Sequence, residues 1–110
     1  MPIFVNPDES RIHRQGEGWV EFTLADDETI GVNAITARRW SFEPGVVGPQ
    51  LEHGDAEQMI YVISGGGVAL VNEDTLPLTT ETMLWLEPGD RYQFKSGEQG
   101  LEILQGFAPG

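Results

Sequence analysis

Residues 45–71 carry most of the information about the fold, and they read GVVGPQLEHGDAEQMIYVISGGGVALV. Short runs of β-branched and aromatic residues alternate here with glycine, proline and polar residues. The apolar run at 58–64 predicts a continuous buried strand, and 68–71 predicts a second one. The three consecutive glycines at 65–67 predict the turn of a hairpin between these two strands.

The rest of the chain has the same character. No window of eleven or more residues keeps a helical apolar stripe without an interrupting glycine, proline or strand-type alternation. Pro77 indicates an edge strand, because proline cannot donate a hydrogen bond to a sheet. Many short strands separated by turn signals are typical of a β-sandwich or β-barrel. Further strands are expected at 19–24, 30–42, 76–78, 83–86, 91–95 and 101–107.

Length and composition limit the possible functions. A chain of 110 residues is expected to form one domain, spanning residues 1–110. The absence of cysteine excludes disulfide frameworks, iron–sulfur clusters and thiol catalysis. A net charge of -12, with only six basic residues, argues against binding to nucleic acid or to an anionic membrane. No targeting or membrane-spanning segment is visible, so a cytoplasmic location is expected.

Two segments resemble the paired motifs of the cupin superfamily. Residues 45–65 combine a Pro-Gly start, a polar loop and a Tyr-Val-Ile-x-Gly strand end, similar to the first cupin motif. Residues 84–94, which read LWLEPGDRYQF, are similar to the second. The resemblance covers about half of the chain. It implies an all-β fold of the cupin type, a double-stranded β-helix or jelly-roll barrel.

The resemblance also implies positions for metal ligands. Cupins typically have His-x-His, then a glutamate five residues later, and a further histidine after the second motif's Pro-Gly turn. The corresponding positions here are Leu51, His53, Gln58 and Tyr92. Leucine cannot coordinate a metal, a glutamine amide is a weak donor, and tyrosine must first lose a proton with a reference pKa of about 10. We therefore expect a ligand-binding interior that holds no cofactor.

An alternative keeps a divalent transition metal. A one-residue slip in the loop would turn Glu57 inward in place of Gln58, so that His53 and Glu57, with Tyr92, would form the metal site. Without that slip, Glu57 is expected to be solvated.

Three further residues are candidates because of their position. Arg38 shares strand parity with Trp40, so an inward Trp40 makes both candidate ligand-binding residues. An inward Arg38 requires an acidic partner or an anionic ligand, and it is then a candidate carboxylate clamp. The opposite interpretation places this parity toward solvent or a partner subunit. His13 is expected at the surface, or in a pocket wall if its segment crosses the barrel.

Three functions remain open at this stage. The first is binding of a small molecule in the barrel interior without the standard metal site. The second is a metal-dependent cupin enzyme, such as a dioxygenase, isomerase or decarboxylase, using His53 and a carboxylate. The third is an assembly module with a filled core. Leu51 at a ligand position favours the first and the third, whereas His53 and the polar Gln58 and Tyr92 favour the first and the second, so the first is preferred. The resemblance also implies a homodimer, joined through barrel faces or through exchanged terminal strands such as residues 2–5.

Overall fold

The computed structural model describes residues 11–26, 35–52 and 54–108. Residues 2–5 and His53 lie outside this part of the chain. Every regular element in the described ranges is a β-strand, as the sequence predicts, and none is a helix that could cross a membrane. The strands are β1 (Arg11–Gly16), β2 (Trp19–Ala25), β3 (Thr36–Phe42), β4 (Leu51–Glu52), β5 (Glu57–Val71), β6 (Asp74–Leu78), β7 (Met83–Leu86) and β8 (Arg91–Ala108).

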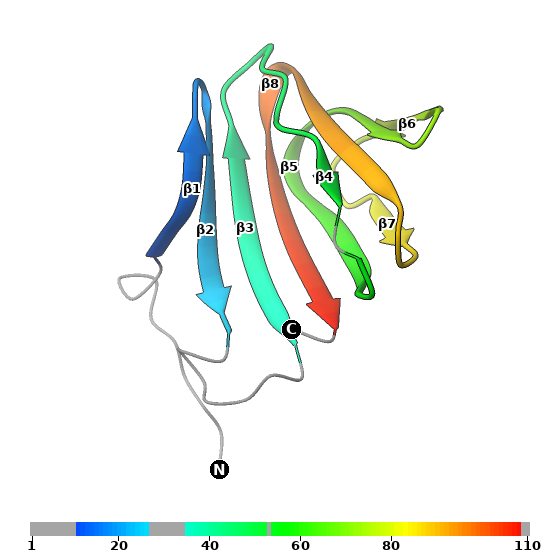
Figure 1. The fold of residues 1–110 in the computed structure, drawn as a ribbon. Helices are drawn as coiled ribbons and strands as arrows, with labels where there is room; N and C mark the ends of the chain where they lie inside the picture. The colour runs from blue at the N-terminus through cyan, green and yellow to red at the C-terminus, as the bar shows by residue number, and fades with distance from the viewer. Residues whose placement is uncertain (1–10, 27–34, 53, 109–110) are drawn as a thin grey trace.

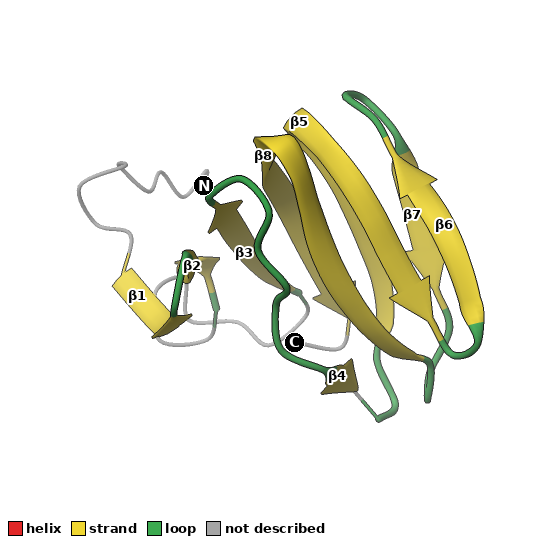
Figure 2. Cartoon of the chain, turned by 90° about the horizontal axis from the view of Figure 1, so that it is seen from above, coloured by secondary structure: helices red, strands yellow, loops and turns green. Residues whose placement is uncertain are grey.

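The strands form one antiparallel hydrogen-bonded sheet that curls into a barrel. Its order is β1-β2-β3-β8-β5-β6, with β4 paired to β8 and β7 paired to β5. The first half of β5 pairs with β7 and the second half of β8, whereas the second half of β5 pairs with β6 and the first half of β8. These two long strands therefore run through both layers, and they lie side by side in Figures 1 and 2.

The predicted hairpin turn at residues 65–67 is wrong. The glycines lie inside β5, where irregular pairing with β8 bends the strand from one layer to the other. Gly65 has a φ of 76°, which side chains rarely adopt. A Cβ atom at Gly65 would overlap the backbone carbonyl of Gly100. Glycine is needed here because two backbones approach closely at a barrel corner, and not because the chain reverses.

This close approach makes Gly65 sensitive to substitution. We expect Gly65→Ala to lower the free energy of unfolding by about 2–3 kcal/mol, since it combines backbone strain with a steric overlap. Gly89→Ala is the matched control, because Gly89 has a φ of 85° but no atom within 4 Å of the position that an alanine methyl group would occupy. It should lose about 1 kcal/mol. Equal losses in urea denaturation would show that the contact with Gly100 is unimportant.

The core lies between the two layers. The ring of Trp40 stacks on Phe42 with centroids 5.8 Å apart, and Phe94 from the other layer meets both rings edge-on. Along β5 the burial alternates, so that Ile60 and Val62 are buried whereas Ile63 is exposed. The run at 58–64 is therefore not buried on both faces as predicted. An antiparallel sheet can leave one face toward solvent, and this one does.

Candidate functional site

Four buried side chains from three strands form one hydrogen-bonded network. Gln105 on β8 lies at its centre. The indole Nε1–H of Trp40 donates to Gln105 Oε1 at 2.7 Å. Gln105 Nε2 donates to Gln58 Oε1 and to the Tyr92 hydroxyl, each at 2.7 Å. None of the four residues is more than 2% exposed. The network joins the two layers, because Tyr92 comes from the first half of β8 and Gln105 from the second.

The direction of each hydrogen bond follows from the tryptophan. An indole N–H can only donate, so it requires the oxygen of the Gln105 amide. The amide nitrogen then points to Gln58 and Tyr92 and uses both of its hydrogens. One donor-only group thus orients the whole neutral network.

Tyr92 is held in its protonated form. Burial raises the pKa of the Tyr92 phenol well above its usual value of 10.0. The hydrogen bond from Gln105 opposes this shift, and the negative charge of Glu21 reinforces it. The phenolate that a metal ion would require is therefore strongly disfavoured at neutral pH.

The structure brings together the three described positions that the cupin motifs align with metal ligands. Leu51 on β4 pairs directly with Tyr92 on β8, and Gln105 links Tyr92 to Gln58. Leu51 and Gln58 are both buried. The fourth position, His53, lies outside the described residues.

These residues do not fit the metal that the fold implies. Glu57 is exposed and Gln58 is buried, so the slip that would turn Glu57 inward does not occur. Strand alternation allows only one of two neighbouring residues to face the interior, and here it is the neutral one. The Gln58 carbonyl oxygen already accepts a hydrogen bond from Gln105. No group of three histidine, aspartate or glutamate side chains that could hold a metal lies within the described ranges.

Arg38 and Trp40 both face the interior. Trp40 is fully buried and the Arg38 side chain is 14% exposed. The acidic partner that an inward Arg38 requires is Glu21 on β2, whose side chain is completely buried. Arg38 Nη1 lies 3.3 Å from Glu21 Oε2, and Arg14 Nε donates to Glu21 Oε1 at 2.9 Å. One buried carboxylate thus holds two arginines.

The buried polar residues gather at one end of the barrel. Thr23 pairs with Arg38, and Arg38 pairs with Gln105, so a polar row crosses β2, β3 and β8. These strand ends, together with the start of β5, lie at the lower end of Figure 1. We call this region the polar end, and it comprises Glu21, Thr23, Arg38, Gln58, Tyr92 and Gln105.

A cavity of about 290 Å³ adjoins the polar end. Buried Thr23 and partly buried Arg38 form its inner wall, and exposed β1 forms its outer wall. His13 lies on this strand, so it is exposed at the surface and also contributes to a pocket wall. The cavity is lined by Arg11, Ile12, His13, Thr23, Asp26 and Arg38.

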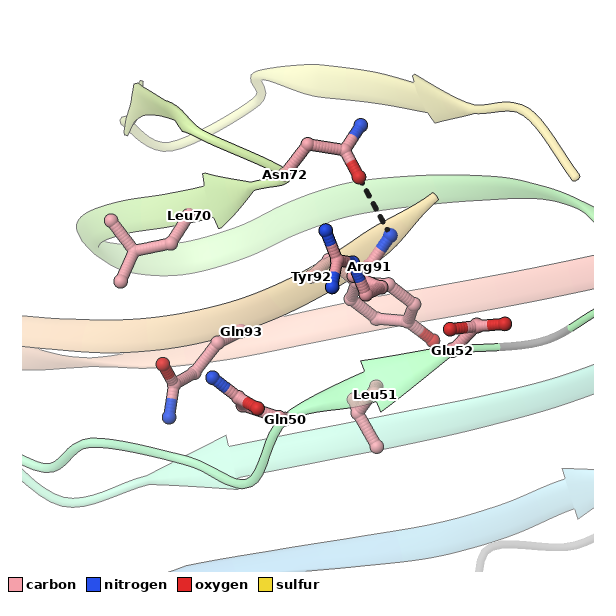
Figure 3. A pocket seen from close by; sticks show the side chains of 8 residues that line it. All are labelled: Gln50, Leu51, Glu52, Leu70, Asn72, Arg91, Tyr92 and Gln93. Atoms are coloured by element: carbon pink, nitrogen blue, oxygen red, sulfur yellow. Dashed lines mark hydrogen bonds between the residues drawn. The ribbon is translucent and has the colours of Figure 1, made fainter. Parts of the chain in front are cut away.

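A second hollow, of about 360 Å³, lies over β4, β5 and β8 (Figure 3). Most of its lining side chains, such as Glu52, Leu70 and Gln93, alternate with buried neighbours on their strands. They therefore belong to the outer face of the sheet. Gln93 is also bonded to the Gly48 carbonyl at 2.7 Å. We call this hollow the outer groove; two buried residues, Leu51 and the polar-end residue Tyr92, also line it.

Three residues of the polar end, Glu21, Thr23 and Gln105, were not predicted as site residues from the sequence. A signal was present for Glu21, because it alternates in phase with Trp19 and Thr23 on β2. The apolar residues Val20, Phe22 and Leu24 have the opposite parity, and they obscure this signal because apolar residues are normally expected on the buried face. Gln105 lies between Ile103 and Phe107, which are both buried, so its parity also indicated an inward side chain.

Comparisons with known proteins identify the fold. No protein-family model and no curated protein matches the sequence. The structure is similar to that of KdgF from a Halomonas species, with a TM-score of 0.82 and 16% identity over 100% of this chain and 96% of the other. An RmlC-like cupin from Shewanella frigidimarina has a TM-score of 0.81 and 19% identity, over 100% and 93% of the two chains. A predicted oxalate decarboxylase from Thermotoga maritima has a TM-score of 0.82 and 18% identity, over 98% and 100%. Together with the inward-facing motif positions, these similarities show that the chain has the cupin fold.

Proposed function

We propose that this protein binds a small organic molecule at the polar end of the barrel, and that it does so without the standard cupin metal site. The observation that carries the proposal is the position of the buried polar side chains. Within the part of the chain that the structure describes, they are confined to one end of an otherwise apolar interior, and that end adjoins a cavity of about 290 Å³. A concave site with a few convergent polar groups is the usual form of a small-molecule site.

A filled barrel that serves only for assembly explains this arrangement less well. Burying polar groups has a cost in free energy even when they are bonded, and an apolar core would avoid it. Here Thr23 and Arg38 border a cavity, whereas in a filled barrel other side chains would pack against them. Polar groups held rigidly beside open space favour a ligand that bonds to them.

Nuclear magnetic resonance on the 12.1 kDa chain tests the proposal. The labelled protein is titrated with millimolar sugars, nucleosides, amino acids and hydroxy acids. We expect at least one class to shift the backbone signals of Thr23 and Arg38 and the side-chain amide of Gln105. The indole signal of Trp85 is the internal control, because Trp85 is 53% exposed on the outer face.

Thr23→Val provides the matched variant. It removes one hydroxyl with little change of shape, and should weaken binding by roughly 2–10-fold, the value of one neutral hydrogen bond. Thr75→Val, on the exposed strand β6, should leave affinity unchanged. Binding confined to the outer groove, or no binding by any class, would overturn the proposal. Stoichiometric uptake of Zn²⁺, Fe²⁺ or Mn²⁺ by the purified protein would replace it with the metal-dependent enzyme.

A further inference from the structure

The layer of the barrel that contains β7 is apolar on its outer face as well as on its inner face. Six residues of β5, β7 and β8 form a continuous apolar surface there, which we call the apolar face: Met59, Tyr61, Ile63, Met83, Trp85 and Leu104. The strand register makes them neighbours, because Tyr61 pairs with both Met83 and Leu104, and Met59 pairs with Trp85. Side chains directly opposite one another on one face of a sheet are close enough to pack together.

Much of the apolar face is open to solvent in the single chain. Six large hydrophobic residues in the described part of the chain are exposed, and three of them, Ile63, Met83 and Trp85, belong to this face. A fourth, Ile35, lies beside it, since its Cδ1 atom is 3.8 Å from the position that a Cβ atom of Gly106 would occupy. Scattered exposed hydrophobic residues are normal, but a contiguous group of them usually marks an interface with another molecule.

The charges around the apolar face favour a second copy of the chain as the partner. The chain has a net charge of -12, yet the six residues of this face are all uncharged. Beside them lie Glu57, at the start of β5, and the pair formed by Arg39 and Glu102, which are bonded at 2.9 Å. A strongly charged partner would find no excess of opposite charge here. A second copy presents the same uncharged surface, and a two-fold axis can place Arg39 of each copy near Glu102 of the other.

We propose that two copies of this chain associate through the apolar face, sheet against sheet. Two antiparallel sheets pack face to face at a separation of about 10 Å, with their apolar side chains interdigitated. Of the two dimers that the sequence leaves open, this is the one joined through barrel faces. The apolar face lies outside the barrel wall and the polar end lies inside it, so the association does not depend on the proposed function.

Sedimentation equilibrium of the full chain measures this association. At about 100 µM we expect a mass of twice 12.1 kDa. The acidic surfaces of the two copies repel each other, so raising the salt concentration should tighten the dimer. The fluorescence of Trp85 gives a local readout, because its indole should become less exposed to water as the protein concentration rises. A monomer at about 100 µM would overturn the proposal.

Trp85→Glu and Trp85→Lys place a charge of either sign in the proposed interface. Each should weaken the dimer by at least about a hundredfold, because an unpaired charge would be buried. The same effect with both signs would exclude added repulsion between acidic chains as its cause. Since Trp85 is 53% exposed in the single chain, both variants should keep the fold, which circular dichroism checks.

Val47→Glu is the matched control. Val47 is also 53% exposed, but it lies beside Lys95 on the first half of β8, in the other layer of the barrel. It should dimerise as the wild type does. A Trp85 variant that dimerises with the affinity of the wild type, or a Val47→Glu protein that is monomeric, would show that the copies do not meet through the apolar face.

Discussion

Gln105→Leu is expected to lower the free energy of unfolding by about 4 kcal/mol. Leucine has a similar volume, so the change removes polar contacts without opening a large cavity. It leaves the Trp40 N–H and the Gln58 carbonyl buried without the partner that each has now, and each such loss costs about 1–3 kcal/mol. Loss of the bond to Tyr92 adds to the effect. Urea denaturation followed by far-ultraviolet circular dichroism measures the difference.

The control for this prediction is Gln99→Leu. Gln99 lies on the same strand but is exposed, so its replacement should change stability by no more than about 0.5 kcal/mol. The Gln58→Leu/Gln105→Leu double variant should lose about 1–2 kcal/mol less than the sum of the single variants, because both remove one shared bond. A Gln105→Leu protein within about 1 kcal/mol of the wild type would show that the network does not stabilise the barrel.

Arg38→Met is expected to lower the free energy of unfolding by about 3–4 kcal/mol. The methionine retains the apolar stem, but it leaves the completely buried Glu21 carboxylate with Arg14 alone. Removing one partner of a buried ion pair is strongly destabilising, because the other charge stays in a medium of low polarity. Thermal and urea denaturation of the variant and the wild type give the loss.

Arg39→Met is the matched control. Arg39 is the next residue on β3 and also pairs with a glutamate, but its side chain is 48% exposed and that of Glu102 is 27% exposed. Surface ion pairs contribute less than about 1 kcal/mol, so this variant should be nearly as stable as the wild type. Similar losses for the two arginines would mean that the burial of Glu21 has no energetic consequence.

These effects link stability to the proposed site. Arg38, which lines the cavity, is held in place by Glu21 and by the ring of Phe107. The same contacts that cost most when broken therefore also pre-organise the binding surface. A rigid polar end requires little reordering when a ligand binds, which favours affinity for small molecules.

Much of the architecture could be predicted from local patterns. The edge strand around Pro77 occurs as expected, and Trp40 takes the inward one of the two orientations that its parity left open. Such features depend on alternation along a strand and on the backbone preferences of glycine, proline and asparagine, which act within a few residues. The glycines at 65–67 were misinterpreted because their role depends on backbone that is distant in the sequence, such as Gly100 beside Gly65 and Lys95 beside Gly67.

The pattern of short strands and turns was sufficient for an all-β sandwich or barrel, and the resemblance to the cupin motifs implied an interior where Leu51, Gln58 and Tyr92 approach one another. It was not sufficient for the partners of those side chains. Gln105 lies 47 residues from Gln58, and Glu21 lies 17 residues from Arg38. Alternation specifies which face a residue occupies, but the curling of the sheet determines which faces meet. Hydrogen bonds and charge pairs act over a few ångströms, so they are set only when the closed barrel brings distant strands together.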